Sequence, residues 1–301
     1  MPLYLTDDQA MLRDTARSFM AEEGAISKQL RHWRDKGCKD GFGHGLWKQF
    51  AEMGFTGILI DEADGGLGLG HVEAGIVLEE IGRNLTPSPF LTSAVAFVEA
   101  LKGTAHAGRW FPGILAGETV AALAIDEGPK HRPEAIEMRA ERSGNGFKLS
   151  GRKQFVVQGA SADITLVAAQ TDEGTTLFAV EKDSKGLEVE GVRLADASIG
   201  ARLTFDDVEV DADAVVGEVG GGEVVLSRVV AYDWLVSLVF MPLGYVAAAP
   251  LAEIEIPTVS LEGSAQNTSP AVPSSVSAPF SCTRPSRSTP ASHDWRTASR
   301  L

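Results

Sequence analysis

Two sets of residues have types and spacings that could do chemistry, and each has a structural alternative. The first is the glycine-rich run DGGLGLG at residues 64–70. Its G-x-G-x-G spacing differs from the dinucleotide-binding fingerprint and no GK[ST] step follows, so we expect a turn between helices that uses positive φ angles. The second set is the adjacent carboxylates Asp126–Glu127 and Asp206–Asp207. Neighbouring residues on a strand point to opposite faces, so we interpret these as solvated turn residues rather than acid–base pairs.

The histidines, cysteines and serines predict neither a metal site nor a nucleophilic enzyme. The chain has six histidines, and no two of them have the spacing of metal ligands on a helix. Cys38 and Cys282 are too few for a disulfide-rich scaffold or a cysteine-based metal site. No G-x-S-x-G sequence is present, which argues against a serine hydrolase of that type. These motifs alone therefore predict no particular catalytic chemistry.

The charge balance excludes one class of partner. Lys and Arg number 27 against 41 Asp and Glu, a net charge of −14 with a pI near 4.9. Nucleic-acid binding rests on neutralising phosphates, so we expect no nucleic-acid partner. The N-terminus shows no signal peptide, and the apolar stretch 234–249 is short for a membrane span of about 20 residues. These features predict a soluble, cytoplasmic protein without a membrane partner.

Residues 1–118 show the periodicity of helices. Thr6 and Gln9 form a capping-box pattern at the start of the first helix. Apolar residues then recur at helical spacing in three stripes, and in the third stripe Glu73, Glu79 and Glu80 are expected to point outward. We predict an all-helical N-terminal domain over residues 1–118.

From about residue 119 the period becomes that of strands. Short, partly β-branched segments are separated by turn sequences rich in Gly, Asp and Ser. The predicted strands are 120–125, 135–142, 146–149, 154–157, 164–170, 175–181, 187–192, 201–208 and 214–216. Many short strands suggest a small antiparallel β-barrel or sandwich domain over residues 119–222. Helices followed by strands place the chain in the α+β class, and the Ser-, Thr- and Pro-rich residues 257–301 are predicted to be a disordered tail.

Several stretches, taken in order, resemble the acyl-CoA dehydrogenase family over about residues 3–230. They are LTDDQAMLRD (5–14), WKQFAEMG (47–54), GILIDE (57–62), GGLGLG (65–70), EEIGR (79–83), GFKLSGRK (146–153) and LTFDDVEV (203–210). The resemblance implies N-terminal helices, a central β domain and a C-terminal four-helix bundle, with FAD between the β domain and the bundle. It also implies α,β-dehydrogenation of an acyl-CoA thioester, in which a carboxylate base removes the α-proton and the flavin accepts the hydride.

Matching the family position by position suggests where FAD would lie. The implied cofactor-binding residues are Leu123, Ala124, Ile125 and Asp126 on one strand and Phe155, Val156 and Val157 on another. The family usually has Thr where this chain has Asp126, and W-[IS]-[TS] where it has residues 155–157. Val157 offers no hydroxyl, so one hydrogen bond worth about 1 kcal/mol is missing. The loop 128–132 (GPKHR) replaces a small Gly/Ser-rich loop that meets substrate in the family.

These departures leave two functions open. The first is an acyl-CoA dehydrogenase, with an electron-transfer flavoprotein as electron acceptor and a homo- or hetero-oligomeric assembly implied by the family. The alternative is a non-catalytic or truncated member that acts only as a partner subunit. The resemblance places the catalytic Glu in the C-terminal bundle, so no residue of this chain is assigned as catalytic.

The chain beyond Val230 does not match the bundle. Residues 223–256 are predicted to be only a remnant of the C-terminal helical domain. A one-base shift of the codons for residues 266–276 permits a sequence close to the bundle motif of the family, so we expect genomic DNA to encode the bundle in a neighbouring frame. A genuinely divergent tail is the alternative.

Overall fold

The first helix begins where the sequence predicts. In the computed structural model, which describes residues 4–194 and 197–230, α1 runs over Asp7–Glu22. The Thr6 hydroxyl accepts a hydrogen bond from the Gln9 amide (3.2 Å), and the Gln9 side chain accepts one from the Thr6 amide (3.0 Å). This reciprocal pair satisfies two amides that the helix itself leaves without partners. The capping box is therefore confirmed.

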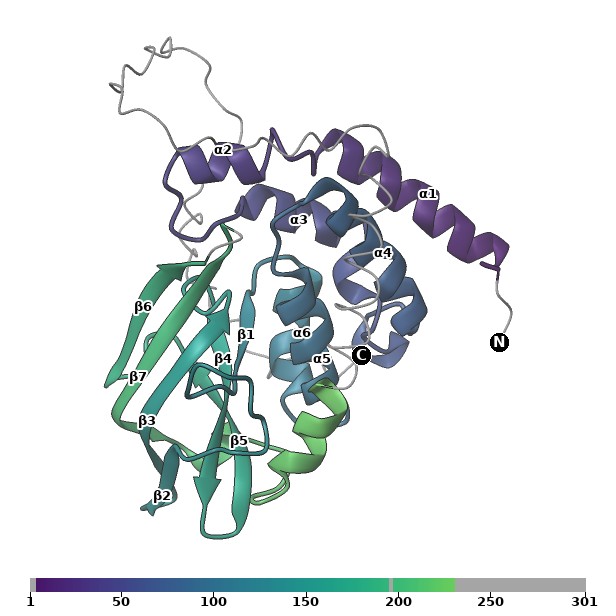
Figure 1. Ribbon diagram of the computed structural model, residues 1–301. Helices are drawn as coiled ribbons and strands as arrows, with labels where there is room; N and C mark the ends of the chain where they lie inside the picture. The colour runs from purple at the N-terminus through teal and green to yellow at the C-terminus, as the bar shows by residue number, and fades with distance from the viewer. Residues whose placement is uncertain (1–3, 195–196, 231–301) are drawn as a thin grey trace, which may run out of the picture.

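The other helices of this part lie with α1 to one side of the sheet, and α4 packs against α1 (Figure 1). They are α2 (Leu30–Asp35), α3 (His44–Glu52), α4 (His71–Asn84), α5 (Val98–Leu101) and α6 (Ala107–Leu115), with short helical turns at Phe55–Gly57 and Glu62–Asp64 and a π-helix at Phe90–Phe97. The glycine-rich run leads into α4 as a turn, with φ of 86° at Gly65 and 60° at Gly68. Its predicted role as a turn is confirmed.

One carboxylate of α4 does not point outward as predicted. The Glu80 side chain is completely buried where α1 packs on α4. Its carboxylate forms ion pairs with the guanidinium groups of Arg17 from α1 (2.9 Å) and of Arg83 from its own helix (2.9 Å). The prediction for Glu80 is wrong because α1 covers a wider face of α4 than the apolar stripe alone indicates, and it brings Arg17 to the charge.

The strands form one eight-stranded sheet, drawn in teal and green in Figure 1. They are β1 (Ala121–Ala124), β2 (Arg139–Ser143), β3 (Gly146–Val157), β4 (Ile164–Thr171), β5 (Gly174–Glu181), β6 (Leu187–Arg193), β7 (Ile199–Val210) and β8 (Val215–Val216). The order is β6-β7-β3-β2-β4-β5-β8, with β1 beside β4. Most neighbours are antiparallel, but β1 and β2 each pair with β4 in parallel. A helical part followed by a mostly antiparallel sheet confirms the α+β class.

Two predicted strands turn out to be one. Segments 146–149 and 154–157 are the two ends of β3, and the sheet register shifts between them. Gly151 lies at this irregularity with a φ of 145°, and an added Cβ would lie 2.8 Å from the Met138 side chain. The strand predicted over 135–142 begins later, at Arg139. An irregular strand looks broken in sequence because its polar and apolar residues fall out of alternation.

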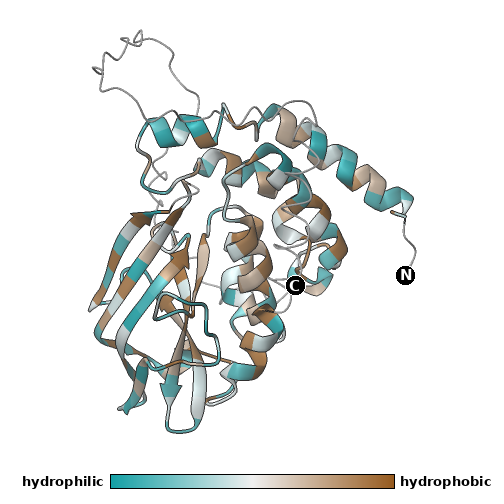
Figure 2. Cartoon of the chain, viewed as in Figure 1, coloured by the Kyte–Doolittle hydropathy of each residue, from teal (hydrophilic) through white to brown (hydrophobic). Residues whose placement is uncertain are grey.

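Two hydrophobic clusters hold these layers together. The first joins the helices to one face of β1, β4 and β5, and the second fills the opposite face of the sheet. In Figure 2 brown and teal alternate along β6, β7 and β3, as expected of strands with one buried face. The first cluster makes the helical layer and the sheet parts of one packed body.

The described chain ends in a helix over residues 222–230. Its Leu226 and Val229 side chains are buried in the first cluster, and Arg228 donates a hydrogen bond to the Glu99 carbonyl oxygen (2.7 Å). The remainder of the predicted remnant (223–256), the predicted tail (257–301) and the reading-frame question lie outside the described residues. The domain limits at 118 and 222 remain predictions. Over the described ranges, the helices are too short or too polar to span a bilayer.

Candidate functional site

The two segments predicted to face the cofactor lie side by side. The Gln154 amide of β3 donates a hydrogen bond to the Asp126 carbonyl oxygen just beyond β1 (2.7 Å), and the Gln154 side-chain amide donates one to the Glu127 carbonyl oxygen (3.0 Å). We name the region formed by residues 123–127 and 153–157 the β1–β3 edge; the side chains of Ala124, Ile125 and Val156 within it are buried. All seven residues predicted to bind the cofactor belong to it.

A buried lysine ties the two segments of the β1–β3 edge together. The Lys153 side chain is fully buried, and its ammonium donates to the Ile125 carbonyl oxygen (2.9 Å) and the Glu127 carboxylate (2.7 Å). Burial lowers the pKa of Lys153, while the hydrogen bond and charge of Glu127 oppose that shift. The pair therefore holds the ends of β1 and β3 in one fixed relation.

Glu127 is thus not the solvated turn residue that the sequence predicts. Besides Lys153, its carboxylate accepts hydrogen bonds from the amides of Glu137 (3.0 Å) and Met138 (3.1 Å). Sequence reasoning missed this cluster, although the G-x-K ending of the hairpin motif 146–153 marked the lysine. No spacing rule links residues 127 and 153, because their contact exists only once β3 lies beside the end of β1 in the folded chain.

The Asp126 carboxylate turns toward the loop that follows it. It accepts a hydrogen bond from the Arg132 amide (3.0 Å) and lies 2.9 Å from His131 Nδ1. The side chain is only 18% exposed. The loop 128–132 therefore supplies the hydrogen-bond partners of this carboxylate. The same contacts hold the loop against the end of β1.

Two apolar side chains stand in solvent on the β3 part of the edge. Phe155 is 51% and Val157 46% exposed, whereas Val156 between them is buried in the sheet. Phe155 has a φ of 53° and lies where the β3–β7 register shifts, so the backbone irregularity sets the direction of its ring. Exposed apolar side chains two positions apart on one strand can together form a binding surface.

The β1 part of the edge offers backbone groups. Ser93 exchanges hydrogen bonds with the Ala121 amide and carbonyl, and Lys153 reaches the Ile125 carbonyl. Because backbone groups alternate in direction along a strand, those of Leu123 point to the same side. Within ranges 4–194 and 197–230, no loop or side-chain hydrogen bond reaches the Leu123 amide or carbonyl, and Leu123 lies opposite Leu166 in the pairing of β1 with β4. Exposed apolar side chains and backbone groups thus both occur along the β1–β3 edge.

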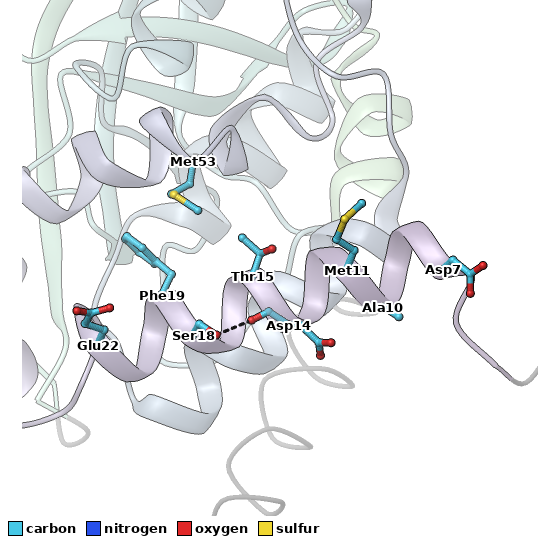
Figure 3. A pocket seen from close by; sticks show the side chains of 9 residues that line it. All are labelled: Asp7, Ala10, Met11, Asp14, Thr15, Ser18, Phe19, Glu22 and Met53. Carbon is cyan, nitrogen blue, oxygen red and sulfur yellow. Dashed lines mark hydrogen bonds between the residues drawn. The ribbon is translucent and has the colours of Figure 1, made fainter.

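A separate hollow of about 780 Å³ lies along α1. It is lined by Asp7, Ala10, Met11, Asp14, Thr15, Ser18, Phe19, Glu22 and Met53. Figure 3 shows Met11, Thr15 and Phe19 directed from α1 toward the side where Met53 lies. Its side chains form no part of the β1–β3 edge, and the sequence predicted no site here.

Comparison with known proteins points to one family for both layers. Residues 6–118 match the domain family described as "Acyl-CoA dehydrogenase, N-terminal domain", and residues 126–208 match "Acyl-CoA dehydrogenase, middle domain". A mitochondrial isovaleryl-CoA dehydrogenase of Pongo abelii is 30% identical over 266 residues, covering 81% of this chain and 60% of that protein. The chain thus spans about 60% of the length of such relatives.

Solved structures share the fold. A glutaryl-CoA dehydrogenase from Mycobacterium smegmatis in complex with FADH2 is 24% identical, with a TM-score of 0.67 over 80% of this chain and 62% of that one. The ChsE4–ChsE5 complex from Mycobacterium tuberculosis is also 24% identical, with a TM-score of 0.70 over 78% of this chain and 63% of that one. At these identities the likeness establishes the arrangement of helices and sheet.

Proposed function

Because this chain belongs to the acyl-CoA dehydrogenase family, we propose that it binds FAD at the β1–β3 edge and takes part in the α,β-dehydrogenation of an acyl-CoA thioester. The observation that carries the proposal is the exposure of Phe155 and Val157 on the segment of β3 that is hydrogen-bonded to the end of β1. A flat aromatic cofactor with polar atoms on its rim needs apolar side chains and backbone groups, and both occur along this edge. The FADH2 complex of a protein with the same fold supports the same cofactor.

The residues present fit a flavin ring in part. Phe155 offers a face for stacking, and the Leu123 amide and carbonyl offer one donor and one acceptor for the ring's polar rim. Val157 contributes apolar contact but no hydroxyl, so the ring would receive one hydrogen bond fewer than in relatives with Thr or Ser. We therefore expect flavin binding to be weaker than is typical for the family.

The described residues would bind and orient the cofactor. When bound, FAD supplies the chemistry of accepting a hydride from the substrate. Lys153 and Glu127 hold the ends of β1 and β3 together, so the positions of the Leu123 backbone and the Phe155 ring relative to each other would be kept constant. The hydrogen bonds of Asp126 direct its charge into the loop 128–132, away from a ring that becomes electron-rich on reduction.

Proton removal from the substrate is not assigned to a described residue. In the family that step belongs to a Glu of the C-terminal bundle, and residues 231–301 lie outside the described structure. We propose an electron-transfer flavoprotein as the electron acceptor, a cytoplasmic location and an oligomeric assembly, as the family implies. A role as the non-catalytic partner of a related chain is the second candidate, favoured by the Val157 substitution and by the existence of a complex such as ChsE4–ChsE5.

The test is the colour of the purified chain and its response to substrate. Bound oxidised flavin absorbs in the visible range, and acyl-CoA should bleach it without added reductant. A yellow protein that bleaches supports the dehydrogenase. A yellow protein that does not bleach until a related chain carrying the family's C-terminal bundle is added supports the partner-subunit role. A colourless protein that takes up no FAD in a fluorescence titration refutes the proposed cofactor.

A further inference from the structure

A hollow of about 440 Å³ lies where α6 meets the sheet. Its walls come from α6, from the end of β5 with the turn that follows it, and from the end of β7 with the short helical turn Ala212–Ala214. The buried His106 donates a hydrogen bond from Nε2 to the Val215 carbonyl oxygen of β8 (2.9 Å), which joins the start of α6 to the sheet at this point. We name it the α6 hollow, and its lining residues lie outside the β1–β3 edge.

The rim of the α6 hollow is acidic. Two of its carboxylates have cationic partners, since Glu181 pairs with Arg109 and Glu209 lies 3.8 Å from Lys148. Three more are exposed and form no ion pair within the described part of the chain: Asp183, Asp211 and Asp213. Exposed carboxylates are common on any protein surface, so this rim alone would not indicate a ligand.

A buried tryptophan in the same lining supplies the second observation. Trp110 of α6 is 9% exposed, and its indole Nε1 has no hydrogen-bond acceptor among the described residues. A buried indole N–H usually has such a partner. The Arg109 guanidinium lies over the indole ring, 4.9 Å from its centroid, so the ring face already holds a cation of this chain. The hollow therefore lacks an acceptor for the indole and cations for its remaining carboxylates.

From these contacts we propose that the α6 hollow binds an arginine-containing segment of a partner protein. A main-chain carbonyl oxygen of that segment accepts the hydrogen bond of the Trp110 indole, and its guanidinium groups pair with the three unpaired carboxylates of the rim. A polypeptide carries a cation and an oxygen acceptor side by side, whereas a simple alkyl cation offers no acceptor. The net charge of −14 favours the approach of such a basic segment.

The test measures the binding of short peptides to the full-length chain. The probe is the peptide GRGRG with blocked ends. Its neutral control carries citrulline in place of both arginines, and n-butylguanidinium supplies the cation without a carbonyl. Binding is followed by NMR through the indole N–H signals of the five tryptophans, among which Trp110→Phe identifies the signal of Trp110.

Two matched double variants test the rim. Asp211→Asn/Asp213→Asn removes two charges from the α6 hollow. Asp61→Asn/Asp64→Asn removes the same charge from two exposed side chains outside its lining. Circular dichroism verifies that each variant is folded.

The GRGRG peptide should shift the Trp110 indole proton downfield and bind at least tenfold more tightly than the citrulline peptide. Asp211→Asn/Asp213→Asn should weaken this binding on the order of tenfold and reduce its dependence on salt, while the control variant stays within about twofold. Trp110→Phe, which keeps an aromatic ring but removes the N–H, should weaken binding roughly fivefold, equivalent to one hydrogen bond.

Three results would overturn the proposal: equal affinity for the two peptides, no saturable binding of GRGRG, or binding that leaves the Trp110 indole signal in place. Equal affinity for n-butylguanidinium and GRGRG would overturn it too, because the carbonyl would then contribute nothing and the hollow would select a small cation. The proposed cofactor site is unaffected by any of these outcomes, since the two regions share no residue.

Discussion

Replacing Lys153 by Met is the most direct test of how the β1–β3 edge is held. The methionine fills the volume of the lysine stem but removes the ammonium, so the Ile125 carbonyl and the Glu127 carboxylate each lose a donor. Removing one partner of a buried ion pair typically costs 3–5 kcal/mol. Glu127 keeps two backbone donors and is 18% exposed, which moves the expectation toward the lower end. We expect the free energy of unfolding to fall by about 3 kcal/mol.

The measurement is urea unfolding followed by circular dichroism and tryptophan fluorescence, with the slope in urea unchanged if only stability is affected. A loss of about 3 kcal/mol corresponds to a melting temperature lower by roughly 6–12 °C for a folded body of this size. Lys148→Met is the control, since Lys148 lies on the same strand but pairs only with exposed carboxylates at 3.6 and 3.8 Å. It should cost less than about 1 kcal/mol.

A double variant separates the ion pair from simple loss of packing. Adding Glu127→Gln to Lys153→Met removes the uncompensated charge while keeping an oxygen for the amides of Glu137 and Met138. We expect the double variant to recover about 1–2 kcal/mol relative to the sum of the two single variants. Two results would show that the Lys153–Glu127 ion pair does not stabilise this edge. One is a loss of unfolding free energy in Lys153→Met no larger than that in Lys148→Met, and the other is additivity of the effects of Lys153→Met and Glu127→Gln.

Three further variants test other parts of the structure. Val157→Thr should restore a hydroxyl at the flavin surface and tighten FAD binding about fivefold, equivalent to one hydrogen bond, in a fluorescence titration; unchanged affinity would place the ring elsewhere. Gly151→Ala, whose Cβ would lie 2.8 Å from the Met138 side chain at a φ of 145°, should lower stability to urea by about 1–3 kcal/mol, and a neutral result would contradict that geometry. Burial by itself would raise the pKa of Glu73, but the hydrogen bonds from Gln9 and from backbone amides outweigh it and lower the pKa below its usual 4.5. The ionised form therefore stabilises the fold above that pH and this contribution disappears as pH falls through the lowered pKa, so the stability advantage of wild type over Glu73→Gln should shrink in acid unfolding curves.

Local patterns were enough to predict most of the secondary structure. The Thr6–Gln9 capping box, the glycine turn before α4 and the change from helical to strand period near residue 119 all depend on neighbours within a few positions. For that reason they can be read from one sequence. The resemblance to a family supplied the choice of Phe155 and Val157 as binding residues, and the structure shows both in solvent on one strand.

What the sequence determined by itself was therefore the kind and order of the elements, because hydrophobic period and capping act over single turns and adjacent residues. Tertiary structure decided where the charges go. Glu80 is buried because α1 brings Arg17 across it, and Glu127 is largely removed from solvent because the packing of β3 beside the end of β1 brings Lys153 to 2.7 Å. Tertiary structure also decided two features of the sheet. These are the parallel pairing of β1 with β4 and the continuity of β3 through its irregularity. Whether a charged side chain can be buried, or which strand a strand pairs with, depends on a partner far along the chain. That partner comes into contact only when the helices and the sheet pack together.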